Sequence, residues 1–475
     1  MSRSPASVNT GPGGPLAGSV DIRTVPKVSL ISLGCPKNLV DSEVLLGHLL
    51  EGGFYLCEDP KDSDIVLVNT CSFLEASRAE SMEAIRGALK LKRDGRVKGV
   101  VVAGCLPQKY REDLLRDVPD ADALLGVTRR EEVVDICRRI LGRNGGGAGT
   151  DDQVVRTPLQ CETDRTRLRL TPRHYAYVRV MEGCNHPCAF CLIPQIRGRF
   201  RSKPVGELVL EAERLAKDGV REINLIAQDS TSYGEDLYGG PSLAKALRAL
   251  SGVDGVEWIR ILYAYPARVT DDLIDEIAGN PKVVKYLDMP IQHVSDRMLT
   301  AMRRQISGPD QAALLRRIRA RVPGIALRTT LIAGFPGETD ADVDETIGFL
   351  REFRFERLGC FAYSREPGTQ ADRMEGHLPA DVIGERRDRI MTAQQKILFD
   401  VYRTWVGREV PAIVDRPLGK DRWEARTWAD APEVDAALIL NGRDLAPGSI
   451  VTARIEGYKG YDLAGRVVET AASPV

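Results

Sequence analysis

Two long stretches of the chain alternate short apolar runs with segments of helical periodicity, and this rhythm limits the fold more than any other feature. The first stretch runs from Lys27 to about Arg143 and contains the apolar runs KVSLISLG, DIVLVNT and VKGVVVAG. The second runs from about Thr171 to Gln370 and offers six strand candidates, among them YAYVRVMEG and REINLIAQ. Such alternation predicts parallel sheets built from β–α units, so the expected fold class is α/β.

The length of 475 residues is too great for one ordinary core and predicts several domains. We expect a disordered leader over residues 1–25 and an N-terminal parallel-sheet α/β domain over residues 26–142. A glycine-rich linker over residues 143–169 leads to a TIM-like or partial β/α barrel over residues 170–400, because six β–α repeats are typical of one. Short alternating strands predict a small antiparallel β-barrel over residues 405–473.

Charge and hydropathy exclude several classes of protein. The chain has 66 basic and 67 acidic residues, which gives no overall attraction to nucleic acid or anionic membranes. No stretch approaches the roughly 20 apolar residues that cross a bilayer, and the first residues lack the basic and apolar regions of a signal peptide. We therefore expect a soluble, cytoplasmic protein whose ten cysteines serve metals or catalysis rather than disulfides.

Three cysteines lie close together in MEGCNHPCAFCLIP, directly after a predicted strand: Cys184, Cys188 and Cys191, the loop triplet. Three thiolates on one loop suit zinc or an iron–sulfur cluster. Zinc requires a fourth ligand, but His186 lies between two of the cysteines and Cys161 lies outside the compact run. Three ligands on a 4Fe–4S cubane leave one iron open to chelate S-adenosylmethionine. The CxxxCxxC spacing at the first strand of a barrel therefore favours a catalytic cluster over structural zinc.

Another three cysteines each follow an apolar run: Cys35, Cys71 and Cys105, the strand-end triplet. Because the carboxyl ends of parallel strands lie along one edge of a sheet, where ligands of open α/β folds bind, these thiols are predicted to converge on a second metal cluster. The alternative is three buried cysteines without a ligand. The remaining cysteines show no such placement and are expected to be ordinary thiols: Cys57, Cys137, Cys161 and Cys360.

Reactive atoms gather at the carboxyl ends of barrel strands, so residues there are candidates for holding a cofactor. Taken singly, each is more readily explained as a turn glycine or a core tyrosine, but on successive strands they form a plausible site. The candidates are Gln228, Asp229, Tyr263, Tyr265, Gln292, His293, Arg328, Gly334, Pro336 and Gly337. The run IRGRFRSKP after the loop triplet is either solvated or supplies a positive field for carboxylates.

The chain resembles the methylthiotransferases, a family of radical S-adenosylmethionine enzymes, from about Pro26 onward. CNHPCAFC matches the cluster motif of radical S-adenosylmethionine enzymes, with Phe190 before the last cysteine. The resemblance implies that the loop triplet holds a catalytic 4Fe–4S cluster and the strand-end triplet an auxiliary 4Fe–4S cluster. It also implies that the terminal barrel is a TRAM domain.

Two segments are similar to the branch of the family that modifies a ribosomal protein. They are SLGCPKNLVDSE and APEVD, although Ala436 stands where a glycine is expected after the second. From Val401 onward the chain has ten basic and eleven acidic residues, whereas an RNA-binding barrel is expected to carry a basic surplus. A protein substrate is therefore favoured over transfer RNA.

The resemblance implies methylthiolation of the β-carbon of an aspartate in the small-subunit ribosomal protein twelve. The reduced catalytic cluster would cleave S-adenosylmethionine to a radical that takes hydrogen from the substrate. Sulfur from the auxiliary cluster would then be inserted, and a second S-adenosylmethionine would supply the methyl group. The low-potential electrons would come from a flavodoxin or ferredoxin type partner. Two alternatives stay open: a transfer RNA adenosine methylthiotransferase, and a non-catalytic RNA-binding protein with structural zinc.

Overall fold

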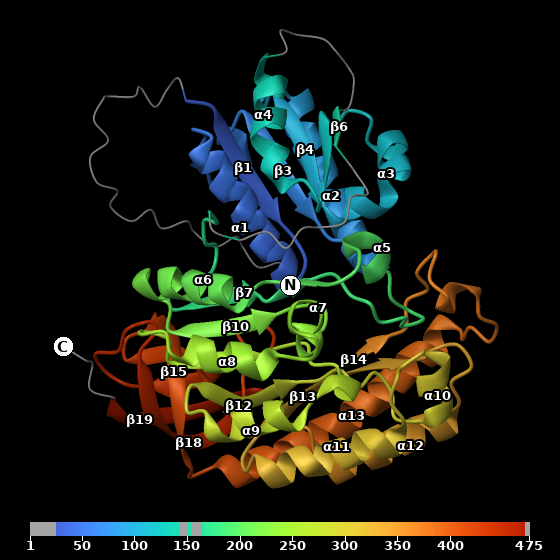
Figure 1. Ribbon diagram of the computed structural model, residues 1–475, viewed down its shortest axis with the longest axis vertical. Coiled ribbons are helices and arrows are strands. Elements are labelled where there is room, and N and C mark those ends of the chain that lie inside the picture. Colours follow the sequence, from blue (N-terminus) through green and yellow to red (C-terminus); the bar gives the residue numbers. More distant parts are fainter. Residues whose placement is uncertain (1–24, 143–150, 154–163, 165, 471–475) are drawn as a thin grey trace. The chain divides into compact units, whose positions relative to one another are not determined.

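The computed structural model describes residues 25–142, 151–153, 164 and 166–470 (Figure 1). The predicted leader lies almost entirely outside these residues, as does most of the predicted linker. The chain divides into two compact units. The first comprises Met1–Leu170 together with Glu182–Asn185 and Leu192–Arg201, and the second comprises the remaining residues.

The first unit contains a six-stranded parallel sheet with the strand order β2-β1-β3-β4-β5-β6. Its strands are β1 (Lys27–Ser32), β2 (Tyr55–Cys57), β3 (Ile65–Thr70), β4 (Gly99–Gly104), β5 (Ala123–Gly126) and β6 (Asp151–Gln153). Its helices are α1 (Pro36–Glu51), α2 (Glu75–Arg93), α3 (Cys105–Asp117), α4 (Val133–Gly142) and α5 (Ile193–Arg197). Strand β6 lies within the segment predicted as a linker, where the sequence has no strand periodicity.

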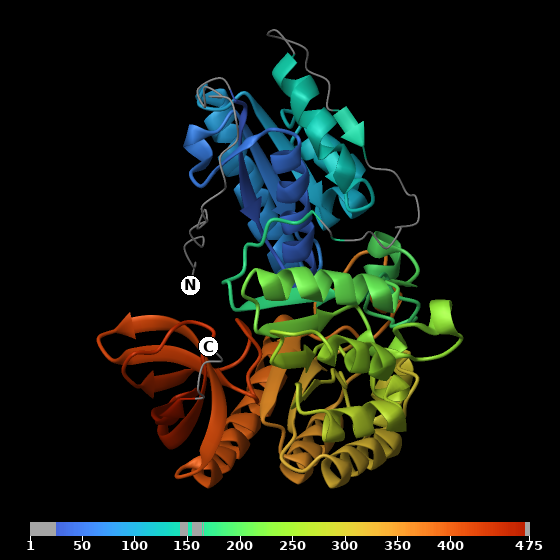
Figure 2. The ribbon, with the colours of Figure 1, turned by 60° about the vertical axis from the view of Figure 1, so that its left-hand side comes forward.

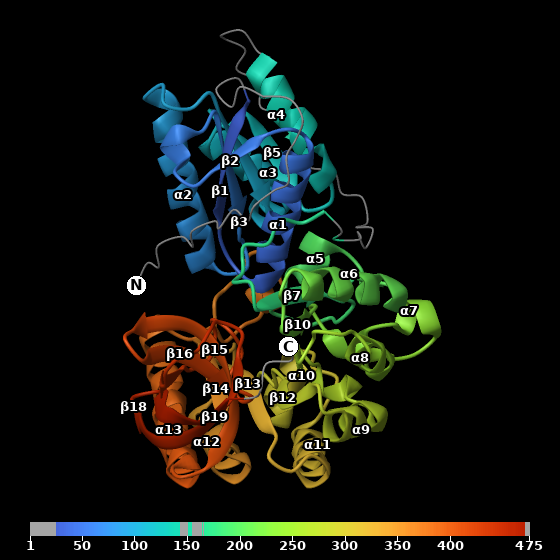
Figure 3. The ribbon, with the colours of Figure 1, turned by 90° about the vertical axis from the view of Figure 1, so that its left-hand side faces the viewer.

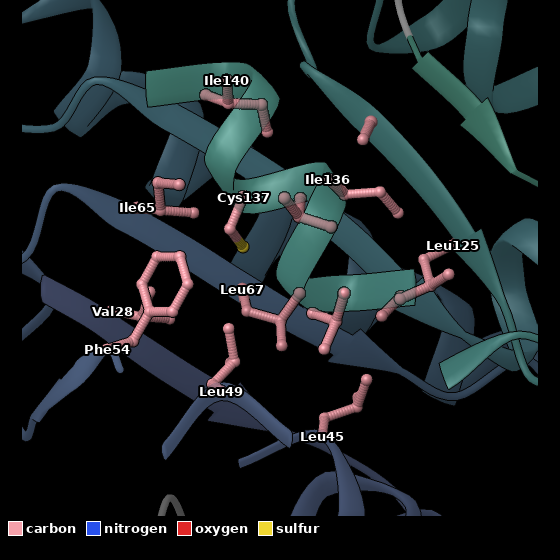
Figure 4. Close-up of a cluster of buried hydrophobic side chains, with 14 residues drawn as sticks. Val28, Leu45, Leu49, Phe54, Ile65, Leu67, Leu125, Ile136, Cys137 and Ile140 are labelled. Carbon is pink, nitrogen blue, oxygen red and sulfur yellow. The ribbon is translucent and has the colours of Figure 1, made fainter. Parts of the chain in front are cut away.

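Both faces of the central strands are covered, which explains why β3 and β4 are continuous apolar runs instead of alternating ones. On one face, α1 and α4 pack side chains such as Leu45 and Ile136 against the sheet (Figure 4). On the other face, α2 and α3 supply Ile85 and Leu114. The first unit is thus a three-layer α/β/α domain. The edge of the sheet at which the strands end is the place expected for a ligand.

The second unit contains a six-stranded parallel sheet in which strand order follows the sequence, β7-β10-β11-β12-β13-β14, and the sheet does not close. The predicted partial β/α barrel is confirmed. Its strands are β7 (Tyr175–Arg179), β10 (Glu222–Ile226), β11 (Trp258–Ile261), β12 (Val283–Asp288), β13 (Ala326–Ala333) and β14 (Arg357–Ala362). Its helices are α6 (Val205–Lys217), α7 (Glu235–Tyr238), α8 (Leu243–Ser251), α9 (Asp271–Gly279), α10 (Asp296–Ala301), α11 (Gly308–Arg321), α12 (Asp340–Phe353) and α13 (Ala380–Trp405). Short strands β8 (Met181–Glu182) and β9 (Arg201–Ser202) flank the segment that carries the loop triplet.

A small closed barrel follows α13, with the strand order β15-β16-β17-β19-β18 (Figures 2 and 3). Its strands are β15 (Glu409–Gly419), β16 (Arg422–Thr427), β17 (Leu438–Asn441), β18 (Ile450–Lys459) and β19 (Asp462–Thr470). The predicted small barrel is confirmed, but β17 and β19 pair in parallel, whereas the other four pairings are antiparallel. Among the described helices, none is long and apolar enough to cross a membrane.

Candidate functional site

The strand-end triplet lies where three neighbouring strands of the first unit end. Cys35 follows β1 and is the N-cap of α1, Cys71 follows β3, and Cys105 follows β4 as the first residue of α3. Two of the thiols therefore lie at helix amino termini, whose partial positive charge favours thiolates. Cys71 and Cys105 are buried and Cys35 is exposed, so this edge is open to solvent on one side.

The three thiols are close neighbours. A Cβ placed on Gly34, which has a φ of +93°, would lie 2.7 Å from the Cys71 Cβ, so the loop before Cys35 lies directly against Cys71. Burial raises the pKa of the Cys71 thiol, and Cys35 contributes to the rise. Burial also raises the pKa of Cys105 to about 12; Arg197 opposes this pKa rise and the other two thiols add to it.

Arg197 places a permanent positive charge beside the strand-end triplet. Its side chain is 2% exposed, and its Nη2 donates to Cys105 Sγ over 3.3 Å and to Asp41 Oδ2 over 2.7 Å. Its Nη1 donates to both carboxylate oxygens of Glu182 over 3.1 Å. Burial opposes the charge of Arg197, but Asp41, Cys105 and Glu182 hold its pKa well above the usual value. The positive field predicted for IRGRFRSKP is present here, although the carboxylates it meets belong to the protein.

Two buried asparagines fix the spacing of the strand ends. Asn38 Nδ2 donates to the carbonyl of Thr70, and Asn69 Nδ2 donates to the carbonyl of Asn38 over 2.9 Å. These bonds tie the first turn of α1, next to Cys35, to the end of β3, next to Cys71. Nothing in the sequence pattern distinguishes these amides from ordinary turn residues, so the sequence analysis did not identify them.

The loop triplet lies on one continuous loop after β8. Cys184 is buried and its amide donates to the carbonyl of Gly198 over 3.1 Å. Cys188 and Cys191 are half-buried, and the Cys191 amide donates to the carbonyl of Cys188 over 3.1 Å. This turn between the last two cysteines sets the direction of both side chains.

A three-layer stack of side chains supports the loop triplet within the second unit. The ring of His186 lies 3.7 Å from that of Tyr265 at an angle of 6°, and the Arg304 guanidinium lies 4.0 Å from the centre of the Tyr265 ring. His186 Nε2 lies 2.6 Å from Asp229 Oδ2. Arg304 Nη1 donates to Cys188 Sγ over 3.6 Å. His186 and Arg304, at the two ends of the stack, therefore hold the loop that carries the cysteines. No pattern in the sequence predicts the contact of Arg304.

A single metal ion and a cubane place different demands on the two triplets. Among the described residues, no three His, Cys, Asp or Glu side chains converge as one ion requires. Each cysteine of a cubane binds a different iron, so its thiols need not meet at one point. His186, the fourth zinc ligand considered in the sequence analysis, is instead hydrogen-bonded to Asp229. Cys161, the other ligand considered, lies outside the described residues.

The predicted cofactor residues lie at different positions along the barrel strands. Gln228 follows β10, Tyr263 follows β11, and Pro336 follows β13 and is buried, so these three stand at carboxyl ends as predicted. Phe190 is half-buried against the apolar cluster of Phe335. Tyr263 has a φ of 63°, which is unusual for a residue with a side chain. Their contact with a cofactor stays a prediction.

Two of the predicted cofactor residues have other partners. Arg328 is the third residue of β13 and not at its end, and its guanidinium donates to Asp288 Oδ1 over 2.8 Å and Asp435 Oδ1 over 3.3 Å. A Cβ on Gly334 would lie 2.5 Å from Ile383 Cγ1, so on that side of its backbone the glycine packs closely against helix α13. The sequence could not show either contact, because each partner lies far along the chain.

Three family models match successive parts of the chain. The uncharacterized protein family UPF0004 matches residues 27–126, the radical SAM superfamily matches residues 178–350, and the TRAM domain matches residues 406–468. A solved radical S-adenosylmethionine methyltransferase, TsrM from Kitasatospora setae, is similar in fold with a TM-score of 0.54 at 15% identity, covering 73% of this chain and 74% of that one.

Curated relatives match almost the whole chain. The protein from Opitutus terrae named ribosomal protein uS12 methylthiotransferase RimO is 44% identical over 92% of this chain and 96% of its own length. Relatives with the same name from an Anaeromyxobacter species and from Symbiobacterium thermophilum are 44% and 43% identical over 93% and 96% of this chain, and over 93% of their own length in each case. With its three matching domains and this identity over nearly its full length, the chain belongs to the RimO family of methylthiotransferases.

Proposed function

We propose that this chain attaches a methylthio group to the β-carbon of an aspartate in ribosomal protein uS12. The observation that carries the proposal is the presence of two thiol triplets in one chain, one on the CxxxCxxC loop and one at the carboxyl ends of β1, β3 and β4. Radical formation requires the first, and storage of sulfur requires the second. Relatives that are 44% identical bear the name of this activity.

The loop triplet would hold the catalytic 4Fe–4S cluster, and the strand-end triplet would hold the auxiliary one. When bound, the catalytic cluster supplies the electron that cleaves S-adenosylmethionine, and the auxiliary cluster supplies a site for sulfur. The residues of this chain would then orient the bound groups and exclude water from the site. The proposed cofactor contacts are Phe190, Gln228, Tyr263, Arg328, Gly334 and Pro336.

The charges beside each triplet fit thiolate ligands. A cluster bound by three thiolates brings negative charge into a buried place, which a protein tolerates only with nearby cations or dipoles. Arg197 and two helix amino termini meet this need at the strand-end triplet. Arg304 meets it at the loop triplet.

The proposal includes two partners. The substrate is a protein of the small ribosomal subunit, which places the enzyme in the cytoplasm, and a flavodoxin or ferredoxin type protein supplies electrons. The near-neutral C-terminal barrel favours this protein substrate over transfer RNA, because phosphate contacts call for a basic surface. From Val401 onward, the end of α13 and the barrel together have ten basic and eleven acidic residues.

Mass spectrometry of uS12 and of transfer RNA from a strain that lacks this gene tests the proposal. We expect uS12 to lose its methylthio group while the adenosines of transfer RNA stay unchanged. The gene returned on a plasmid should restore the modification, and a copy with Cys184→Ala should not. Loss of a methylthio group from adenosine, with uS12 unaffected, would instead assign transfer RNA as the substrate.

A further inference from the structure

The segment that joins β16 to β17, Trp428–Asp435, enters the amino-terminal end of the partial barrel; we call it the floor segment. Every strand of the barrel except β10 contributes a side chain that contacts it directly. The hydrogen bonds are from Tyr175 to Glu433, Tyr177 to the Pro432 carbonyl, Arg260 to the Trp428 carbonyl, Tyr286 and Arg328 to Asp435, and Arg357 to Asp430. Strand β10 is connected to the floor segment only indirectly: Glu222 Oε2 lies 2.6 Å from Nη2 of Arg426, which stands just before the segment.

These contacts are those of a buried element and not of a free binding surface. The side chains of Asp430 and Asp435 are 1% and 4% exposed. Asp435 Oδ2 accepts from Tyr286 over 2.8 Å and from the amide of Ala431 over 2.9 Å, which closes the segment on itself. The floor segment contains APEVD, so its carboxylates are occupied by the barrel and are not available to a substrate.

One route leads from the floor segment to the backbone of Tyr263. Arg328 joins Asp435 to Asp288, and Asp288 Oδ2 accepts from the Tyr263 amide over 3.2 Å. Tyr263 stands at the carboxyl end of β11 with a φ of 63°, a strained conformation that persists only when neighbouring groups hold it. The Tyr263 carbonyl also accepts from the amide of Ser230 over 2.9 Å, so loops after two strands meet at this residue.

We propose that Asp435 is a positioning residue, which acts through Arg328 and Asp288 to hold Tyr263 at the mouth of the barrel where S-adenosylmethionine binds. The inference rests on the proposed function, since it requires the cofactor to bind near Tyr263. It gives the C-terminal barrel a role in the radical step besides any contact with substrate. It also explains why Arg328 lies within β13: the guanidinium reaches Asp288 at the rim and Asp435 at the floor.

The test compares Asp435→Asn with Asp430→Asn in the full-length, reconstituted chain. Both variants remove a buried carboxylate charge from the same segment, but Asp430 contacts Arg357 and Thr427 and is not on the route to Tyr263. Equilibrium dialysis should show that Asp435→Asn weakens binding of S-adenosylmethionine about tenfold. Asp430→Asn should bind it within about twofold of wild type, although thermal unfolding should show both variants to be destabilised. The rate of 5'-deoxyadenosine formation at low cofactor concentration should fall only in Asp435→Asn.

Two results would overturn the inference alone. One is equal affinity of wild type and Asp435→Asn for S-adenosylmethionine. The other is an equal loss of affinity in both variants, because the floor segment would then act only through general stability. A wild-type chain that binds no S-adenosylmethionine at all would instead overturn the proposed function, and the inference with it.

Discussion

Arg197 Nη2 lies 3.3 Å from Cys105 Sγ, and the same guanidinium holds Asp41 and Glu182. Glu182 stands two residues before Cys184 in the sequence. The Arg197 side chain therefore contacts both a ligand of the proposed auxiliary cluster and a residue that leads into the loop of Cys184. All of these residues but the thiol are charged and nearly inaccessible to solvent. Removal of this cation would leave Arg130 as an ion-pair partner of Asp41 and would take a buried positive charge away from Glu182.

Arg197→Gln should destabilise the first unit by about 3–5 kcal/mol, because it breaks a buried ion-pair network and removes the cation that Asp41 and Glu182 share. Urea unfolding of the apo-protein measures this loss. Reconstituted Arg197→Gln should also hold less iron than wild type. Arg199→Gln is the matched control, since Arg199 is exposed on the same segment and its loss should change stability by less than about 0.5 kcal/mol. An unchanged unfolding curve for Arg197→Gln would contradict the network.

Anaerobic reconstitution should give about eight iron atoms per chain, as two 4Fe–4S clusters require. The variant with alanine at Cys35, Cys71 and Cys105 should retain about four. Cys57→Ala is the control, because Cys57 pairs with Ser29 inside the sheet, belongs to neither triplet and should not change the iron count. About four iron atoms per wild-type chain would contradict the prediction of a second cluster.

The two triplets should be separable by activity. Cys184→Ala should abolish formation of 5'-deoxyadenosine, because the loop triplet would no longer hold a catalytic cluster. Cys71→Ala should retain part of this cleavage and lose insertion of sulfur into the substrate. Chromatography of 5'-deoxyadenosine beside mass spectrometry of uS12 distinguishes the two losses. A Cys71→Ala enzyme that still makes methylthiolated uS12 at the wild-type rate would remove the strand-end triplet from the reaction.

Arg304→Gln should lower the midpoint potential of the catalytic cluster by on the order of tens of millivolts. The guanidinium donates to Cys188 Sγ and carries a positive charge, so it stabilises the more negative, reduced cluster. A redox titration followed by electron paramagnetic resonance measures the potential. Arg303→Gln serves as the control, since Arg303 is the exposed neighbour of Arg304. An identical potential in Arg304→Gln and wild type would rule out this role.

Stability should fall in acid partly through Asp415. Burial pushes the pKa of Asp415 up, but Arg426 and His174 outweigh it and hold the pKa below the usual value of 3.8. As pH falls below about 4 the unfolded chain takes up the proton first, so this stabilisation, present above that pH, is lost as pH falls through the folded pKa. Urea unfolding of the apo-protein should show the gap between wild type and Asp415→Asn narrowing in acid. The exposed Asp421→Asn should run parallel to wild type, and a constant gap for Asp415→Asn would contradict the prediction.

The repeating β–α pattern predicted much of this fold, because a parallel strand order constrains where the strand ends lie. That constraint is why Cys35, Cys71 and Cys105 were predicted to converge from sequence positions far apart. Arg304 escaped prediction because its contact with Cys188 depends on a loop after α10, whose path no periodicity encodes. The parallel pairing of β17 with β19 also escaped, since short alternating strands show which face is buried and not which neighbour they pair with.

The position of the floor segment has a consequence for protein engineering. Its partners on the barrel strands include Arg260 and Arg357, whose charges are buried beneath it. A truncation before β15 would bare these arginines to water and remove the acceptors that the floor segment supplies, which would leave Arg260 with Glu222 and Arg357 with the Glu356 carbonyl. A chimaera that grafts the terminal barrel of a relative onto this chain must therefore carry a floor segment matched to the strands it closes.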